Sequence, residues 1–312
     1  MENQMAAKQN RKKVRAKYHG GMVEKNSVGG WIADILITII LIAFMFVCVI
    51  PLWYSLVASF SDGFTLFRTE GMIWLPVGKW NVEGYKHIFA SNEVWRGYGN
   101  TLLYMVTATF LGTILNVIGG YAMSRKTRYR NVMILYVMFT MMFSGGMIPT
   151  YIVMKGLGLV DSPLAVIIPT CTNAWFMVLT MNGFLSVPES TIEAAQIDGA
   201  GHLRIMFQIA FPQTMGISLV VILYALVAQW NNWFQAYLYL NSNAAKLWYP
   251  LQLVVDQMIA RNANFLQSGN IDYSRYLIPF GLVVVSTVPI LIVFPFFQKY
   301  IEKGALMGGV KE

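Results

Sequence analysis

Charged residues are scarce in this chain of 312 residues. Asp, Glu, Lys and Arg make up 12% of it, whereas hydrophobic residues make up 56%. Soluble domains carry about 25% charged residues. Several apolar stretches also reach the roughly 20 residues that a helix needs to cross a bilayer. The composition therefore excludes an ordinary soluble domain and predicts an all-α, polytopic membrane protein.

The residues that disulfides, metal sites and enzyme centres require are also few. The two cysteines, Cys48 and Cys171, lie within apolar runs, which favours a buried apolar role over a disulfide framework or a metal site. None of the histidines, His19, His87 and His202, belongs to a metal-binding motif. The sequence also lacks a G-x-S-x-G elbow and an ATP-binding P-loop. We therefore expect a non-catalytic chain without its own cofactor or metal.

Six apolar segments have the length of membrane spans. We expect these spans at residues 35–57, 98–124, 131–153, 164–185, 215–240 and 277–297. The chain then consists of a basic tail (1–30), a six-helix membrane domain (31–298) and a short tail (299–312), with polar loops at 61–96 and 241–275. Both tails and the loop 125–130 are basic, so the positive-inside rule places both termini in the cytoplasm. The net charge of +8 thus indicates membrane orientation rather than a nucleic-acid partner.

Ionisable residues are almost absent from the spans themselves. The second, fourth, fifth and sixth spans contain no Asp, Glu, Lys or Arg. Proton-driven carriers usually hold such groups within the membrane because these groups relay protons. Coupling to sodium through backbone carbonyls remains an alternative. The pattern favours a pore or a permease that takes its energy from elsewhere.

Small and polar residues recur every four positions in the second span. They are Ala108, Gly112, Asn116, Gly120 and Ser124. Such a seam lets helix backbones approach closely in lipid. Packing against a neighbouring helix is therefore the favoured interpretation, and lining of a pathway is the alternative.

One half of the fifth span is polar when it is drawn as a helix. The residues on that half that are candidates for a translocation pathway are Gln229, Asn231, Asn232, Gln235 and Tyr239. A polar face in a membrane helix should contact protein or water, and amides and phenols hydrogen-bond sugar hydroxyls without adding charge. A polar contact with another helix is the alternative interpretation.

A short polar segment, residues 190–201, separates the fourth and fifth spans. Ser190 and Glu193 have the spacing of a capping box, and Pro188 before them disfavours continuation of the fourth span. Gly199 and Gly201 are expected to end the helix as residues that tolerate the left-handed conformation. Its small residues, Ala194, Ala195 and Ala200, would let another protein approach closely.

The stretch EAAQIDGAGHLRIMFQIAFPQ resembles the EAA motif of binding-protein-dependent ABC importer permeases. Glu193, Ala194 and Ala195 are followed by Gly199, Ile209 and Pro212 at the spacing of that motif, and Phe211 replaces the usual Leu. The sequences NGFLSVPESTIEAAQIDGAG, QWNNWF and EKGALMGGVK resemble the carbohydrate branch of the family, specifically the shorter permease subunit of maltose-type importers. The resemblance extends from Trp31 to the C-terminus.

The resemblance implies a set of partners and a role for the motif. Two permeases pair in the bilayer of the bacterial plasma membrane, two ATPase subunits that hold ATP and Mg²⁺ dock below them, and an extracellular solute-binding protein delivers the carbohydrate. The segment that contacts the ATPase would include Glu193, Ala194, Ala195, Asp198, Gly199 and Gly201. The C-terminal residues Gly308, Gly309 and Lys311 would reach toward the ATPase pair. Alternatives are an ABC permease for another solute, such as a peptide or polyol phosphate, and an ion-coupled carrier.

Overall fold

The structure, a computed structural model, describes residues 28–267 and 272–309. Helices are the only regular elements in these residues, which confirms the predicted all-α class. Contacts divide the chain into two parts, residues 1–54 and 55–312. The described portion of the first part is one helix, which belongs to α2 (Val28–Ser59). Its apolar side chains are exposed along their length, for example Phe44 at 68% and Val47 at 67%, as expected of a helix that faces lipid.

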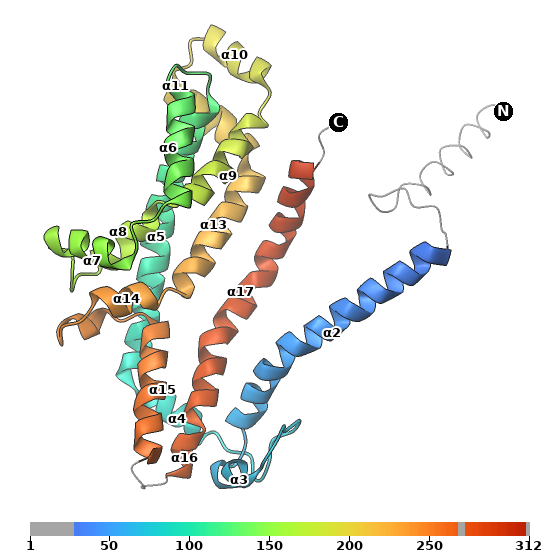
Figure 1. Ribbon diagram of the computed structural model, residues 1–312, viewed down its shortest axis with the longest axis vertical. Coiled ribbons are helices and arrows are strands. Elements are labelled where there is room, and N and C mark those ends of the chain that lie inside the picture. The colour runs from blue at the N-terminus through green and yellow to red at the C-terminus, as the bar shows by residue number, and fades with distance from the viewer. Residues whose placement is uncertain (1–27, 268–271, 310–312) are drawn as a thin grey trace. The chain divides into compact units, whose positions relative to one another are not determined.

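The second part begins at Ser55 and contains the remaining helices (Figure 1). In chain order these are α3 (Gly63–Arg68), α4 (Glu83–Ala90), α5 (Asn92–Ser124), α6 (Arg130–Met142), α7 (Met147–Gly156), α8 (Leu164–Cys171), α9 (Ala174–Leu185), α10 (Glu189–Ile197), α11 (His202–Arg204), the π-helix η1 (Ile205–Ala210), α12 (Phe211–Gln213), α13 (Met215–Trp230), α14 (Phe234–Tyr239), the 3-10 helix η2 (Ala245–Trp248), α15 (Leu251–Gln267), α16 (Tyr273–Tyr276) and α17 (Ile278–Gly309).

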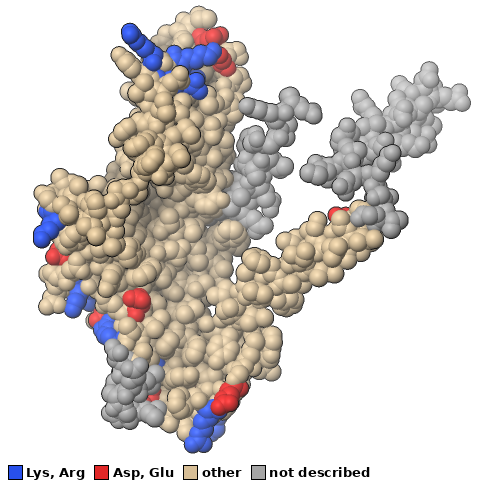
Figure 2. Space-filling model, in the orientation of Figure 1, with Lys and Arg blue, Asp and Glu red and all other residues tan. Residues whose placement is uncertain are grey.

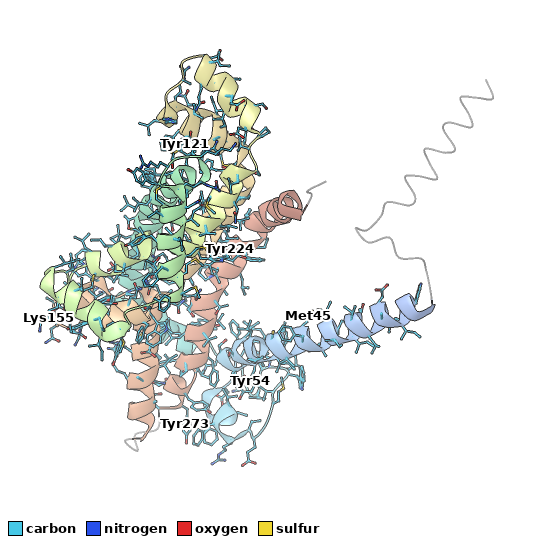
Figure 3. All side chains as sticks on the ribbon, turned by 45° about the horizontal axis from the view of Figure 1, so that its top comes forward. Met45, Tyr54, Tyr121, Lys155, Tyr224 and Tyr273 are labelled. Atoms are coloured by element: carbon cyan, nitrogen blue, oxygen red, sulfur yellow. The ribbon has the colours of Figure 1, made fainter. Side chains whose placement is uncertain are left out.

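Helices α5 and α17 run between two ends of this part (Figure 1). Helices α10 and α11 lie at one end, called here the α10 end, and α3, α4 and α16 lie at the other, the α16 end. Lys, Arg, Asp and Glu atoms are visible at the α10 end, along the side where α7 and α14 lie, and at the α16 end, with an uncharged surface between the α10 end and α7 (Figure 2). At the α16 end, α3 rests on α16, where the rings of Phe64 and Tyr273 meet edge to face with their centroids 5.0 Å apart (Figure 3).

The small-residue seam of α5 is buried, so the predicted packing role is confirmed. A Cβ on Gly112 would lie 2.7 Å from the carbonyl oxygen of Cys171, and one on Gly120 would lie 2.9 Å from the amide nitrogen of Met181. Because both neighbours are backbone atoms, α8 and α9 approach α5 more closely than any side chain at these two positions would allow.

The described residues contain four helical segments long and apolar enough to cross a membrane. They are Gly30–Ser59, Asn92–Ser124, Leu164–Leu185 and Tyr273–Phe296. Two helix pairs, α6 with α7 and 202–213 with α13, would add two more spans, but they bend by 112° and 86°. The predicted third span is therefore not one straight helix. Its break covers residues 143–146 and includes Gly146, whose φ of +85° lies in the left-handed region that favours glycine.

The predicted fifth span is also interrupted, so its expected continuity to residue 240 is wrong. Helix α13 ends at Trp230, and α14 starts at Phe234. The side-chain amide of Asn231 donates to the carbonyl oxygen of Val227 at 2.9 Å. This bond occupies a carbonyl of the last turn, and such local side-chain bonds offer the backbone an alternative to continuing the helix.

The segment 241–275, expected to be a loop, contains the 17-residue helix α15. Helix α5 holds the chain that leads into it. The Asn100 amide donates to the carbonyl oxygens of Leu247 and Tyr249 at 2.8 and 3.0 Å, and the Tyr104 hydroxyl donates to that of Trp248 at 2.7 Å. These bonds fix η2 and the start of α15 against α5. The loop expected at 61–96 likewise contains α3 and α4.

The two predicted tails fall partly outside the described residues. Residues 1–27 of the basic tail lie outside them, and so does Lys311 near the other end of the chain. The segment expected to be a C-terminal tail from residue 299 continues the helix α17, which includes Gly308 and Gly309.

Candidate functional site

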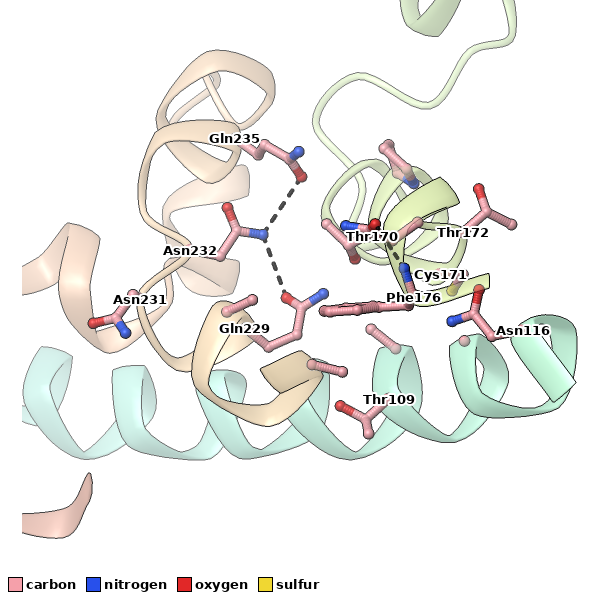
Figure 4. A pocket seen from close by; sticks show the side chains of 16 residues that line it. Thr109, Asn116, Thr170, Cys171, Thr172, Phe176, Gln229, Asn231, Asn232 and Gln235 are labelled. Carbon is pink, nitrogen blue, oxygen red and sulfur yellow. Dashed lines mark hydrogen bonds between the residues drawn. The ribbon is translucent and has the colours of Figure 1, made fainter. Parts of the chain in front are cut away.

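A cavity of about 350 Å³ lies beside the middle of α5 (Figure 4). Helix α5 contributes one wall, the junction of α8 and α9 a second, and α13 with α14 a third. The residues that line it are Ala108, Thr109, Gly112, Asn116, Pro169, Thr170, Cys171, Thr172, Asn173, Phe176, Ala225, Ala228, Gln229, Asn231, Asn232 and Gln235. Three residues of the α5 seam are among them, so this seam both packs against α8 and α9 and lines the cavity.

Two interrupted helices create this cavity. Pro169 lies inside α8, and Thr172 and Asn173 separate α8 from α9. The side-chain oxygen of Asn173 caps α9 by accepting from the amides of Trp175 at 2.9 Å and Phe176 at 3.3 Å. The second interruption is the segment between α13 and α14. Helix breaks at membrane depth are tolerated where they line a cavity or are buried in protein.

The cavity is polar but carries no charged side chain. The Asn232 amide donates to the side-chain oxygens of Gln229 and Gln235 at 3.3 and 3.4 Å, both near the upper limit for a hydrogen bond. Thr109 Oγ1 and Asn116 Oδ1 are buried without a hydrogen-bond partner in the described part of the chain. An unpaired buried polar atom is costly, so a movement of either side chain that let it reach a hydroxyl or amide group in the cavity would be favoured.

The structure brings four of the five predicted pathway residues to this cavity: Gln229, Asn231, Asn232 and Gln235. It does not bring Tyr239 there. That residue is 3% exposed, and its ring is stacked on that of Tyr151 with the centroids 6.1 Å apart. The break after Trp230 ends the single helical periodicity, so the face drawn for a continuous helix does not extend to Tyr239.

Sequence reasoning missed the contribution of the fourth span and of Thr109. The run PTCTN, residues 169–173, supplies five consecutive lining residues. This contribution could have been predicted from the proline followed by hydroxyl and amide side chains in the middle of an apolar segment, a pattern typical of a broken membrane helix. In residues 28–267 and 272–309, no three His, Cys, Asp or Glu side chains lie together as a metal site would require.

The segment that carries the EAA motif forms α10 at the far end of α5. Its N-cap is Pro188, without a side-chain hydrogen bond, so the predicted capping box of Ser190 and Glu193 is wrong. The helix begins at Glu189, which places Ser190 inside the first turn. Gly199 has the predicted left-handed backbone, with φ of +77°, whereas Gly201 is extended, with φ of −70°, and precedes α11. The expectation for Gly201 is therefore also wrong.

One face of α10 packs on its own chain. Ile192 and Ala195 are 4% and 7% exposed and join a cluster that includes Tyr121, Phe184 and Met206. The expectation that Ala195 lies open to another protein is therefore corrected, because this cluster occupies its surroundings. The exposed residues of this region include Glu193, Ala194, Ile197, Asp198 and, in α11, Leu203; these five are called here the α10 outer face. Two of them are large apolar residues, with Ile197 86% and Leu203 71% exposed.

The basic loop 125–130 ties α10 to α5. Lys126 Nζ lies 2.7 Å from a Glu189 carboxylate oxygen, and Arg125 donates to the carbonyl oxygen of Phe184 at 3.0 Å. The Lys126 hydrogen bond and charge, together with the Arg125 charge, lower the pKa of Glu189 below its ordinary value. Exposed ion pairs of this kind contribute little to the free energy of unfolding. Their importance here is positional, because they link α10 to the helix that lines the cavity.

Membrane-length helices around an uncharged polar cavity, with an exposed helix at one end, define a multi-pass membrane transport protein. The chain belongs to the family described as binding-protein-dependent transport system inner membrane component, whose model matches residues 20–306. The resemblance found in the EAA motif is thereby confirmed. The chain is a permease component of such a system.

Relatives and a solved structure support this assignment over most of the chain. The chain is 33% identical to the polygalacturonan/rhamnogalacturonan transport system permease protein YtcP of Bacillus subtilis, covering 89% of this chain and 98% of that protein. It is 28% identical to the arabinooligosaccharides transport system permease protein AraQ of Halalkalibacterium halodurans, covering 85% and 92%. A chain from the crystal structure of a bacterial ABC transporter involved in the import of the acidic polysaccharide alginate matches with a TM-score of 0.79 and 29% identity, covering 89% and 99%.

Proposed function

We propose that this chain is one of two permease subunits of an ATP-driven importer for an oligosaccharide. The observation that carries the proposal is the cavity beside α5, which is lined by hydroxyl and amide groups and no charge. Sugars present many hydroxyl groups, and neutral hydrogen-bonding side chains recognise these without the desolvation cost of a buried charge. The relatives named above include permeases for oligosaccharides and polysaccharides.

The proposed orientation places the α10 end in the cytoplasm and the α16 end outside the cell. The short loop 125–130 supports it, because four of its six residues are Lys or Arg. Six spans follow if each bent helix pair crosses the membrane once, and both termini then lie in the cytoplasm. In this orientation an extracellular solute-binding protein would deliver the solute at the α16 end.

The α10 outer face is the proposed contact with an ATPase subunit, which would hold ATP and Mg²⁺. Ile197 and Leu203 offer apolar surface there, and Glu193 and Asp198 offer carboxylates. Gly199 and Gly201 would shape the turn at this contact, and the C-terminal residues Gly308, Gly309 and Lys311 would approach the ATPase pair. Because Lys126 and Arg125 tie this region to α5 and α9, a displacement of α10 would be transmitted to the cavity.

Uptake by the Asn232→Leu variant tests the role of the cavity. Leucine keeps a similar volume but removes the amide that contacts Gln229 and Gln235. We expect uptake of the oligosaccharide to fall about tenfold, as the loss of one or two hydrogen bonds implies, while co-purification with the partner subunits persists. Asn243→Leu is the control, since this exposed asparagine lies outside the cavity. Loss of assembly in Asn232→Leu alone would instead assign the amide a structural role.

Co-purification tests the proposed energy source. The tagged chain should bring down a second permease and an ATPase, and ATP hydrolysis by this complex should rise when the liganded binding protein is added. Transport by the isolated chain driven by a sodium gradient would refute the proposal and favour an ion-coupled carrier. Uptake of peptides or polyol phosphates, but of no sugar, would keep the importer and change its solute.

A further inference from the structure

A second cavity, of about 220 Å³, lies toward the α16 end, where the first turns of α5 meet η2 and α15. The residues that line it are Glu93, Arg96, Lys246, Leu247, Tyr249, Val254, Gln257 and Arg261. It thus joins three segments that are far apart in the sequence. Unlike the cavity in the middle of α5, it contains charged side chains, and three of the four are cations.

The charges of this second cavity are not balanced. Arg261 forms a two-pronged pair with Glu93, with Nη2 and Nη1 at 2.5 and 3.4 Å from the two carboxylate oxygens. Arg96 and Lys246 have no carboxylate within 4.0 Å in the described part of the chain. The cavity therefore presents two cations beyond the one that Glu93 neutralises, and it favours an anionic ligand.

The backbone that carries these cations is well fixed. Lys246 belongs to η2, which Asn100 and Tyr104 hold through their bonds to the carbonyl oxygens of residues 247–249. Arg96 precedes Gly97, where a Cβ would lie 3.0 Å from the Cα atom of Leu251, so α5 and the start of α15 touch closely. A frame of this kind reduces the ordering that a ligand must impose, which favours binding.

We propose that this cavity binds the carboxylate of an acidic sugar at the outer entrance of the permease. The inference rests on the proposed function, in which the solute is a carbohydrate. Arg96 and Lys246 would hold the carboxylate through charge-assisted hydrogen bonds. Tyr249 and Val254 would contact the sugar ring, and the Gln257 amide would contact a hydroxyl. The recessed shape with an apolar wall fits a sugar ring better than a carboxylate on the surface of a docking protein.

The second cavity is separate from the uncharged cavity beside the middle of α5, called here the neutral cavity. Arg96 and Ala108 are the lining residues of the two cavities that lie nearest each other on α5. They are twelve residues apart, which is about 18 Å along a continuous helix. Acidic sugars would therefore be selected by their charge at the entrance, and the neutral cavity would bind the hydroxyl groups that acidic and neutral sugars share. This separation predicts that the two selectivities can be changed independently.

Binding of two matched trisaccharides tests the proposal. The full-length chain, purified with its associated subunits and placed in nanodiscs, is titrated with trigalacturonate and with galactotriose, which lacks the carboxylates. The double variant Arg96→Gln with Lys246→Gln should bind trigalacturonate at least about tenfold more weakly than the wild type, since each charge-assisted bond contributes more than a neutral one. Its binding of galactotriose should stay unchanged. The control, Lys86→Gln with Lys155→Gln, removes the same charge from residues outside this cavity.

Three other outcomes overturn the proposal. Equal trigalacturonate binding by the wild type and the double variant would mean that Arg96 and Lys246 do not hold the acid. Absence of trigalacturonate binding to the wild type would also mean that Arg96 and Lys246 do not hold the acid. If the double variant instead weakens docking of the sugar-free binding protein and leaves trigalacturonate binding intact, the cations serve protein docking. Binding that depends on Arg96 and Lys246, without import of any sugar, would uphold the acid site and refute the carbohydrate-import function.

Discussion

Replacement of two glycines on the same helix separates close helix packing from helix propensity. Gly99 and Gly112 both lie inside α5, and alanine at either position favours the helix by about 1 kcal/mol. A Cβ on Gly99 would meet nothing within 4 Å, whereas one on Gly112 would lie 2.7 Å from the carbonyl oxygen of Cys171. Since backbone must move to relieve this contact, Gly112→Ala should cost a further amount of about 1–3 kcal/mol.

The difference between the two variants is the quantity to measure. Because the gain in helix propensity is common to both, Gly112→Ala should be less stable than Gly99→Ala by about 1–3 kcal/mol. At roughly 2–4 °C per kcal/mol for a body of this size, its Tm should be lower by several degrees. The assay is thermal denaturation in detergent, followed by size-exclusion chromatography of a fluorescent fusion. A Tm for Gly112→Ala equal to or above that of Gly99→Ala would refute the close approach of α5 and α8.

Further predictions concern the α10 end. Glu193→Lys should abolish co-purification of the ATPase while membrane insertion persists; normal uptake would contradict the proposed contact. Gly199→Asp should lower the free energy of unfolding by about 1 kcal/mol, because the φ of residue 199 is +77°. It should also reduce uptake; uptake at the wild-type level would show that this turn tolerates a side chain. The ion pair of Lys126 with Glu189 should contribute fully to stability above the ordinary carboxylate pKa of about 4.3. It should be lost as the pH falls through the lowered pKa of Glu189. The Tm difference between wild type and Glu189→Gln should thus be constant from neutral pH to about 5 and vanish at lower pH; a difference that persists at pH values well below the lowered pKa would exclude this pair as its source.

The sequence predicts the helical class and the α5 seam because both depend on local composition and regular spacing. The interruptions were harder to foresee, since they depend on single side chains that compete for backbone groups. Asn173 caps α9 and Asn231 bonds to the last turn of α13, yet both asparagines stand in segments whose average composition is that of a continuous span.

Helix α15 was missed for a different reason. Leu251, Leu253 and Val254 at its start are buried because α5 and α17 pack around them. No stretch of it is apolar enough to be a span. Four residues of the neutral cavity, Gln229, Asn231, Asn232 and Gln235, were predicted because they share one side of the fifth span. The fourth span contributes to the cavity through a break in its helix, and only the folded structure shows where this break lies. The second cavity could not be found from the sequence because its charged residues come from segments about 150 positions apart.

The π-helix η1 lies on the connection between the α10 end and α13. A π-helix has i→i+5 hydrogen bonds, so a π-helical turn holds about one residue more than an α-helical turn. If one residue were removed from Ile205–Ala210, this wide turn could close as an α-helical turn, and the helices before and after it would keep their relation. The bend of 86° between residues 202–213 and α13 lies after this turn and would be kept as well. The connection between the exposed helix and the membrane helix can therefore lose one residue at η1 without turning Gln229 and Ala225 away from the cavity that they line.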